Sequence, residues 1–276
     1  MIRNEHSGIV FYTFHNLEKE KKIKHLFSTR LGGVSENQFA SMNLSFSRGD
    51  DRASVVENFR RISELGFPVE KMIFSDQVHG TEIRNVSESD CGKGHLIKSD
   101  IIGVDGLVTN VPGLVLVTFY ADCVPLYFYD RAKNAIALSH AGWRGTLMEI
   151  GKITVNEMKE KFGSRPGDIL VGIGPSICKS CFETGPDVAD MFREKFHYAA
   201  EFITNSQTEP DKSFMDLWGM NKQILMDAGV PEHNIELPDV CTKCNPDIFY
   251  SHRVMGNERG SLAAFLTINH KERERK

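Results

Sequence analysis

Three side chains that can ligate a metal lie at the ends of separate apolar runs in the sequence. Cys123 ends one run, His140 ends the next, and His79 ends an earlier one. Each has a glycine or a proline within two residues, which lets another group approach. Two imidazoles and one thiolate suit zinc and leave its fourth tetrahedral position open for water or substrate. We therefore predict that His79, Cys123 and His140 meet in space and bind a metal.

The spacing of these three residues does not specify the site by itself. They are far apart in the sequence, and their intervals match no short zinc motif. Taken alone, a cysteine in an apolar run is usually a small buried residue. The same ligands also suit copper, and Cys123 could instead be a nucleophile with His79 or His140 as its base. Copper oxidation of phenols is disfavoured, because the ten histidines form no His-x-His pair.

Two residues beside the ligands are further catalytic candidates. Asp122 precedes Cys123 and could act as an acid or base or hold a ligand in place; otherwise it caps the bend. Arg144 lies in a glycine-rich turn before a predicted helix that begins with the capping box Thr146–Glu149. Free N–H groups and a guanidinium there would bind phosphate. The alternative makes Arg144 a solvated cap.

The remaining candidates are arginines and cysteine pairs. Arg30, in a glycine turn, and Arg253 are weaker candidates for binding the phosphate. Cys178/Cys181 and Cys241/Cys244 are two Cys-x-x-Cys pairs that could together form a four-thiolate zinc knuckle. Because the first pair follows a turn-rich stretch, the sequence favours ordinary loops instead.

Composition describes an ordinary globular chain. Its 276 residues are 41% hydrophobic and 25% charged, and the net charge is −4. That charge disfavours nonspecific binding to nucleic acid or to an anionic membrane, and no apolar run approaches the roughly 20 residues of a membrane helix. With six cysteines and no leader sequence, we expect a cytoplasmic protein with reduced thiols. The oligomeric state cannot be predicted.

Periodicity predicts strands and helices in a mixed order. Two helical patterns start at the capping boxes Ser54–Glu57 and Thr146–Glu149. Polar residues 87–98 form a loop that could cover a site. Four closely spaced runs at 104–109, 114–120, 125–129 and 135–139 suggest an antiparallel meander. The other predicted strands are 9–14, 25–29, 72–78, 81–86, 169–173, 249–253 and 262–266, and the other helices are 186–196 and 215–228. No linker divides the chain, so we predict one α+β domain over residues 1–276, with a charged, frayed tail at 269–276.

Several motifs together resemble a known family. In order, they are Ser28–Ser35, Gln77–Gly80, Ala121–Pro125, His140–Gly145, Gly174–Ile177 and Ser251–Arg253. The chain resembles bacterial purine nucleoside phosphorylases of the YfiH/YlmD type, formerly labelled laccase-domain or multicopper polyphenol oxidase proteins. The motif His-Ala-Gly-Trp-Arg-Gly, combined with Ala-Asp-Cys, is highly specific.

The resemblance implies both a fold and a function. It implies a single-domain layered α/β/β/α fold and a zinc ion held by His79, Cys123 and His140. It also implies phosphorolysis of adenosine, inosine, guanosine and methylthioadenosine, with adenosine deamination alongside. The expected partners are therefore purine nucleosides and inorganic phosphate. A zinc-stabilised interaction module fits less well, because structural zinc usually has four protein ligands.

Overall fold

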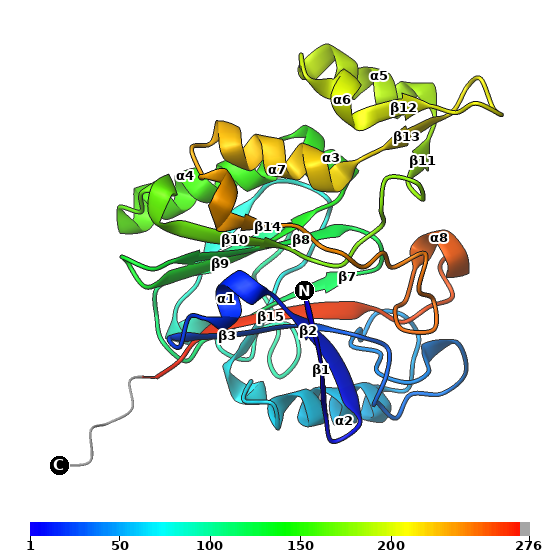
Figure 1. Cartoon of the computed structure of the whole chain (residues 1–276). Helices are drawn as coiled ribbons and strands as arrows, with labels where there is room; N and C mark the ends of the chain where they lie inside the picture. Colours follow the sequence, from blue (N-terminus) through cyan, green and yellow to red (C-terminus); the bar gives the residue numbers. More distant parts are fainter. Residues whose placement is uncertain (271–276) are drawn as a thin grey trace.

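Two six-stranded sheets lie face to face in the computed structural model, which describes residues 1–270 (Figure 1). The first sheet has the order β1-β2-β3-β15-β7-β4, and the second has the order β14-β10-β8-β9-β6-β5. The strands of the first sheet are β1 (Ile2–His6), β2 (Ile9–Thr13), β3 (Ile23–Ser28), β15 (Leu262–Ile268), β7 (Val115–Tyr120) and β4 (Met72–Phe74). The strands of the second are β14 (Ile235–Glu236), β10 (Ile169–Ile173), β8 (Val124–Asp130), β9 (Ala135–Ala141), β6 (Gly106–Thr109) and β5 (Ile83–Asn85).

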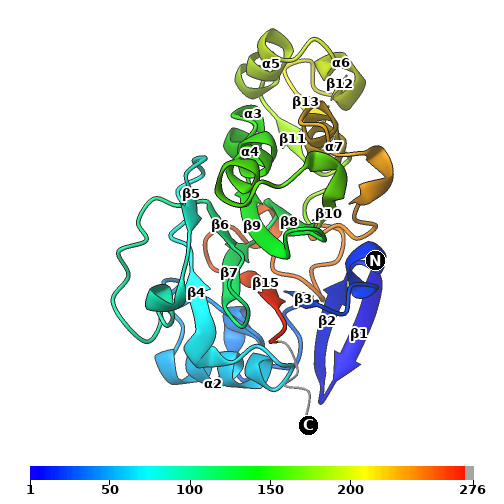
Figure 2. The ribbon, with the colours of Figure 1, turned by 90° about the vertical axis from the view of Figure 1, so that its left-hand side faces the viewer.

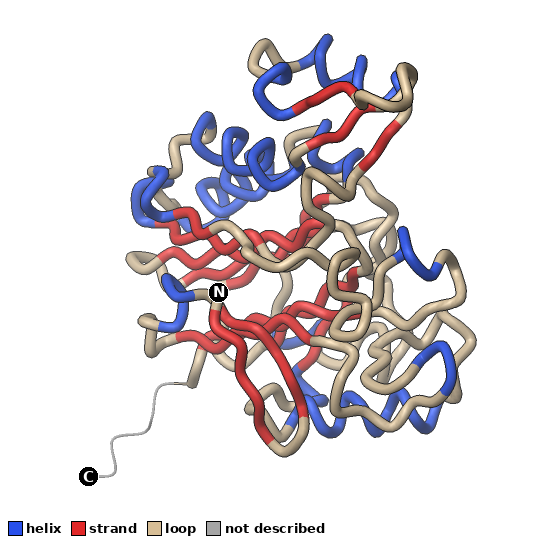
Figure 3. Tube along the Cα trace, turned by 45° about the vertical axis from the view of Figure 1, so that its right-hand side comes forward, coloured by secondary structure: helices blue, strands red, loops and turns tan. Residues whose placement is uncertain are grey.

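Helices cover the outer face of each sheet, so the main body has four layers (Figures 2 and 3). The helix α2 packs on the first sheet, and α4 and α7 pack on the second. A three-stranded sheet, β11-β13-β12, lies with α5 and α6 at one end of the molecule (Figure 1). The helices are α1 (His15–Glu18), α2 (Arg52–Ser63), α3 (Trp143–Leu147), α4 (Ile150–Phe162), α5 (Pro186–Lys195), α6 (Ala199–Phe202), α7 (Leu217–Asp227) and α8 (His252–Met255). The small strands are β11 (Glu183–Thr184), β12 (Ile203–Asn205) and β13 (Ser213–Met215).

Side chains on the two faces of the central strands pack into three separate hydrophobic cores. In β7, Val115 and Val117 pack with α2, whereas Leu116 and Tyr120 pack between the two sheets. Successive side chains of a strand point to opposite faces, so a strand buried on both faces is apolar throughout. The predicted α+β class is therefore confirmed, as a mixed arrangement of parallel and antiparallel strands.

The predicted meander is wrong. β6, β8 and β9 pair in the second sheet, but β7 lies in the first sheet between β15 and β4. The turns before and after β7 carry the chain from one sheet to the other. Because each of these strands is apolar on both faces, the sequence pattern could not indicate which sheet a run joins.

Three predicted boundaries are also corrected. The helix α2 begins at Arg52, because the Asp51 side chain accepts the backbone N–H of Ser54 at 2.9 Å. Thr146 does not start a helix: α3 already begins at Trp143, and α4 starts after Glu149, which has a left-handed φ of 61°. Residues 249–253 are not a strand, since α8 begins at His252.

Two predicted strands are confirmed with shorter bounds. The predicted strand 72–78 ends at Phe74, and the predicted strand 81–86 is reduced to β5. Gly163 ends α4 with a φ of 69°, as its place after the apolar pattern indicated. No helix within residues 1–270 combines the length and apolarity needed to cross a membrane. The end of the charged tail, residues 271–276, lies outside the described residues.

Candidate active site

The structure brings His79, Cys123 and His140 together from three different elements. His79 follows β4 of the first sheet, His140 lies in β9 of the second, and Cys123 lies where the chain crosses from β7 to β8. One ligand atom from each lies within 4.8 Å of the other two, and Cys123 Sγ is 3.9 Å from His79 Nε2. We call these residues the three-ligand centre. It forms where the two sheets meet.

A fully buried carboxylate, Asp105, holds both histidines of the centre. Its oxygens accept the consecutive backbone N–H groups of Val78, His79 and Gly80 at 2.7–3.1 Å. Its Oδ1 also lies 2.8 Å from Nδ1 of His140. With the proton on Nδ1, the Nε2 lone pair of His140 is free to bind a metal. Asp105 therefore fixes the loop that carries His79 and the orientation of the His140 ring.

Gln77 connects the His79 loop to the strand that leads to Cys123. Its side chain donates to the carbonyl oxygen of Phe119 at 2.8 Å and accepts the N–H of Phe119 at 2.7 Å. The side-chain amide thus makes the two hydrogen bonds to Phe119 that a paired strand residue would make, beyond the end of β4. It keeps the two ligand-bearing segments at a fixed separation.

The space around the centre fits a metal ion. A Cβ added to Gly142 would lie 2.9 Å from the His79 ring and 3.3 Å from Cys123 Sγ. A side chain at this position would therefore occupy the space between the ligands. His79 is exposed whereas His140 is buried, so the centre opens to solvent on one side. Such a site can hold zinc with one position left for substrate.

Electrostatics favour the ligand form of the thiol. Burial would raise the pKa of Cys123, but the adjacent His140 and His79 lower it to about 6. For His140, burial opposes the charged form, while Cys123 and Asp105 raise its pKa to about 9. The thiolate is the form of cysteine that binds metals and attacks electrophiles.

Asp122 occupies a tightly held bend beside Cys123. It has a left-handed φ of 80° and is buried. Its carboxylate accepts hydrogen bonds from Thr242 Oγ1 at 2.6 Å, Ser251 Oγ at 3.0 Å and the N–H of Arg253 at 2.7 Å. All of these contacts are to the protein's own chain, so the geometry supports a role in fixing the bend that presents Cys123.

A cavity of about 470 Å³ opens beside the three-ligand centre. A volume of this order accommodates a small organic ligand. Aromatic side chains, serines and two arginines line it. Of the loop 87–98, which was predicted to cover a site, only Gly94 lines the cavity. The lining residues used below are Phe46, Phe74, Phe119, Ser99, Arg48 and Arg259.

Arg259 is a buried cation on the wall of this cavity. Only 6% of the residue is exposed, and among the described residues its Nε has no hydrogen-bond partner. Its Nη1 donates to the carbonyl oxygen of Gly260 at 3.0 Å. Burial and the nearby Arg48 lower the pKa of Arg259 to about 10. A buried guanidinium with an unused donor is a suitable anion-binding group.

The three arginines that the sequence proposed for phosphate do not line the cavity. Arg144 is exposed and its guanidinium lies 4.2 Å from the centre of the Trp143 ring. Arg30 donates to the carbonyl oxygens of Ala40 and Pro246. Arg253 donates to the carbonyl oxygen of Glu183.

The sequence analysis missed Asp105 and Arg259. Asp105 lies inside the run 104–109 that was predicted as a strand, and only its hydrogen-bond partners distinguish it from any other polar residue there. Arg259 lies near the C-terminal end of the chain, in a segment with no recognisable motif. The cysteine pairs Cys178/Cys181 and Cys241/Cys244 form a second group that could hold a metal ion.

Comparison with known proteins places these features in a family. The family described as multi-copper polyphenol oxidoreductase laccase matches residues 24–269. The purine nucleoside phosphorylase YlmD of Bacillus subtilis (strain 168) is 35% identical over 251 residues, which is 90% of each chain. The adenosine deaminase RL5, from an unknown prokaryotic organism, is 33% identical and covers 85% of this chain and 90% of its own.

A solved structure has the same fold. The crystal structure of the hypothetical protein YfiH of Bacillus licheniformis superimposes with a TM-score of 0.88 at 29% sequence identity. The superposition covers 96% of this chain and 98% of the other. The four-layered arrangement described above is therefore shared over nearly the whole length.

Proposed function

This chain belongs to the family described as multi-copper polyphenol oxidoreductase laccase, and we propose that it is a zinc-dependent purine nucleoside phosphorylase with adenosine deaminase activity. The observation that carries the proposal is the three-ligand centre at the edge of the 470 Å³ cavity. The names of the similar relatives support a purine nucleoside and phosphate as substrates, and adenosine as the substrate of deamination. Adenosine, inosine, guanosine and methylthioadenosine are the nucleosides that we propose to test.

His79, Cys123 and His140 would hold the zinc ion through one imidazole nitrogen, one sulfur and one further imidazole nitrogen. When bound, zinc supplies a Lewis acid and can lower the pKa of a water molecule to about 7. Asp105 retains the proton on Nδ1 of His140, so that Nε2 stays available as a ligand. These residues provide the polar end of the cavity.

The aromatic wall would bind the purine. Phe74 and Phe119 line the cavity with ring centroids 5.0 Å apart in an edge arrangement, and Phe46 adds a third ring to the lining. Flat heterocycles stack on such faces, and each stacked base contributes about 1–3 kcal/mol. Ser99 supplies a hydroxyl group on the same wall.

Arg259 and Arg48 would bind the phosphate. In phosphorolysis a phosphate oxygen forms a bond to C1′ of the ribose as the bond from C1′ to the purine nitrogen breaks, and the bonding electrons go to the base. The unused donor of Arg259 could hold one phosphate oxygen and orient another toward C1′. Arg144 remains the alternative, since it was the sequence-based choice.

Replacing Arg259 with methionine should raise the KM for phosphate about 10–100-fold, because a hydrogen bond to a charged group contributes about 1.5–3 kcal/mol. Adenosine deamination, which uses no phosphate, should change much less. The comparison variant is Arg144→Ala, measured for both reactions at saturating nucleoside. A raised phosphate KM for Arg144→Ala together with an unchanged one for Arg259→Met would reverse this assignment.

The proposed function predicts that purified protein converts adenosine to adenine only when phosphate is present, and to inosine without it. Separation of the two products by liquid chromatography measures both reactions in one sample. Oxidation of a phenolic substrate with added copper tests the laccase alternative. Phenol oxidation without either nucleoside reaction would refute the proposal.

A cysteine hydrolase is the second candidate, and the lowered pKa of Cys123 next to His140 favours it. In that case, Cys123 would attack an acyl group directly. An electrophilic acyl analogue would then label Cys123 in chelator-treated protein, and the nucleoside reactions would be absent.

A further inference from the structure

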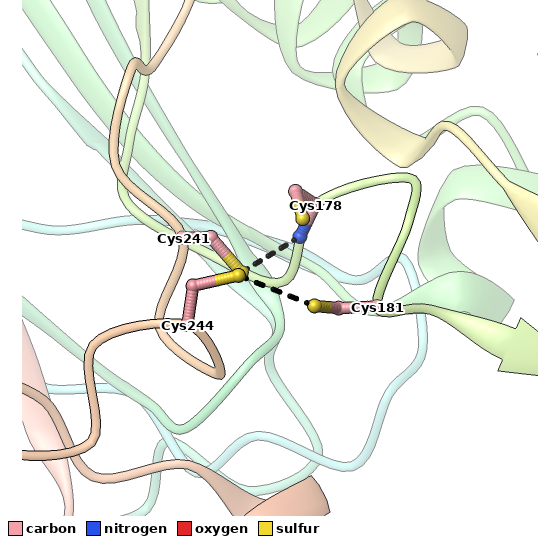
Figure 4. A group of neighbouring side chains, drawn as sticks. All are labelled: Cys178, Cys181, Cys241 and Cys244. Carbon is pink, nitrogen blue, oxygen red and sulfur yellow. Dashed lines mark hydrogen bonds between the residues drawn. The ribbon is translucent and has the colours of Figure 1, made fainter.

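Four cysteine sulfurs meet in a second place in the fold. Two neighbours of these cysteines contact Asp122, the residue before Cys123. Cys178, Cys181, Cys241 and Cys244 each offer a sulfur within 4.8 Å of the others, and Figure 4 shows the side chains converging from two separate loops. We call them the four-cysteine cluster. The sequence favoured ordinary loops for these pairs; instead, the fold joins the segment after β10 to the segment after β14.

The separations match four ligands around one ion. In a regular tetrahedron with Zn–S bonds of about 2.3 Å, the sulfurs lie roughly 3.8 Å apart. The sulfurs of Cys181 and Cys244 are 3.3 Å apart, far longer than the roughly 2.05 Å of a disulfide bond. All six cysteines of the chain are free thiols. The cluster is therefore spaced as a ligand set and not as bonded pairs.

The local backbone has the features of a thiolate site. The N–H groups of Cys181 and Phe182 both point to the carbonyl oxygen of Cys178, which turns the first pair of sulfurs toward the same side. The N–H of Cys178 donates to Cys241 Sγ at 3.3 Å, a bond that stabilises negative charge on sulfur (Figure 4). Cys181 and Cys241 are buried, while Cys244 is exposed and leaves a path for an ion.

An apolar layer covers the buried side of the cluster. Ile177, Phe182 and Trp218 pack against the cysteines in one hydrophobic group. Trp218 also donates from Nε1 to Ser176 Oγ at 2.6 Å, which fixes the loop just before Cys178. Such a layer excludes water and keeps the ligands oriented.

We propose that the four-cysteine cluster binds one zinc ion as a structural four-thiolate site, distinct from the three-ligand centre. Four soft thiolates in tetrahedral range select zinc among the common divalent ions, and a closed ligand set is characteristic of structural sites. The ion cross-links two loops that are about sixty residues apart in the sequence.

Both cross-linked loops also hold Asp122. Ile177, next to Cys178, donates its N–H to the backbone oxygen of Asp122 at 3.0 Å. Thr242, next to Cys241, donates its hydroxyl group to the Asp122 carboxylate at 2.6 Å. The zinc thereby stabilises the left-handed bend that presents Cys123. This positioning role, unlike the metal site itself, rests on the proposed function.

The test measures zinc in the Cys123→Ala variant, in which the three-ligand centre is broken. Protein is purified with zinc and a thiol reductant, freed of loosely bound metal by gel filtration, and analysed by mass spectrometry for zinc per chain. We expect two ions in the wild type, one in Cys123→Ala and none in Cys123→Ala combined with Cys181→Ser. The control Cys91→Ser, which alters a cysteine outside both groups, should retain two.

X-ray absorption at the zinc edge identifies the zinc ligands while all four cysteines of the cluster are present. It therefore tests the proposal even if the Cys181→Ser variant does not fold. For Cys123→Ala we expect sulfur neighbours alone at about 2.3 Å. Absence of zinc from Cys123→Ala, nitrogen in its zinc shell, or a Cys181–Cys244 disulfide after purification under reductant would overturn the proposal. One sulfur-only zinc in both wild type and Cys123→Ala would support the cluster while refuting zinc at the proposed active site.

Discussion

Cys123→Ala is expected to abolish metal binding at the three-ligand centre and to reduce both nucleoside reactions at least about 1000-fold. The estimate follows because metal catalysis contributes several kcal/mol to the barrier, and each 1.36 kcal/mol is a factor of ten. With the thiolate gone, His79 and His140 are left as two neutral ligands, one of them exposed. Zinc titration and product analysis with adenosine measure both losses.

The matched control is Cys91→Ala, which removes a partly buried thiol that does not itself line the cavity. It should keep full metal content at the centre and full turnover. Cys123→Ala protein that phosphorolyses adenosine at the wild-type rate without zinc at the three-ligand centre would show that the reaction does not use the centre. Circular dichroism of both variants checks that the fold is retained.

Asp105→Asn is expected to weaken zinc binding at the three-ligand centre about 10–100-fold and to lower stability. Groups that orient a metal-binding histidine typically contribute that much to affinity. An asparagine has one acceptor oxygen, so its NH₂ group would face backbone N–H donors that the carboxylate accepts. Unsatisfied buried groups cost about 1–3 kcal/mol each, and a loss of that size should lower the Tm by several degrees.

Competition with a fluorescent chelator measures the zinc affinity, and calorimetry measures the Tm. Asp211→Asn serves as control, because Asp211 is exposed and lies in a loop away from the centre. An unchanged zinc affinity in Asp105→Asn would mean that the His140 ring is held by its packing alone. An unchanged Tm would mean that the loop around His79 does not need the carboxylate.

The proximity of His79, Cys123 and His140 could be predicted from the sequence because each lies where an apolar run ends. His79, Cys123 and His140 all mark such points, and side chains there reach a shared rim. Which sheet each apolar run joins could not be predicted. The crossing of β7 into the first sheet depends on which core receives Leu116 and which receives Val117, and both faces of the strand are equally apolar.

Asp105 and Arg259 could not be identified from the sequence, for a different reason. Asp105 and Arg259 acquire their roles from contacts with residues far away in the sequence and from burial, neither of which leaves a local pattern. The cysteine pairs were visible, but nothing in the sequence shows that the loops after β10 and β14 are adjacent. That adjacency follows from the parallel pairing of these two strands.

The position of β15 has a consequence for biosynthesis. This strand is the last one within residues 1–270, yet it lies in the middle of the first sheet, with β3 on one side and β7 on the other. A ribosome must therefore deliver β15 before the sheet can close. Until then β3 and β7 present two long unpaired edges, which are sites of aggregation. Since β7 leads directly to Cys123, a chain that stops before β15 would lack the strand that holds β7 in place beside the three-ligand centre.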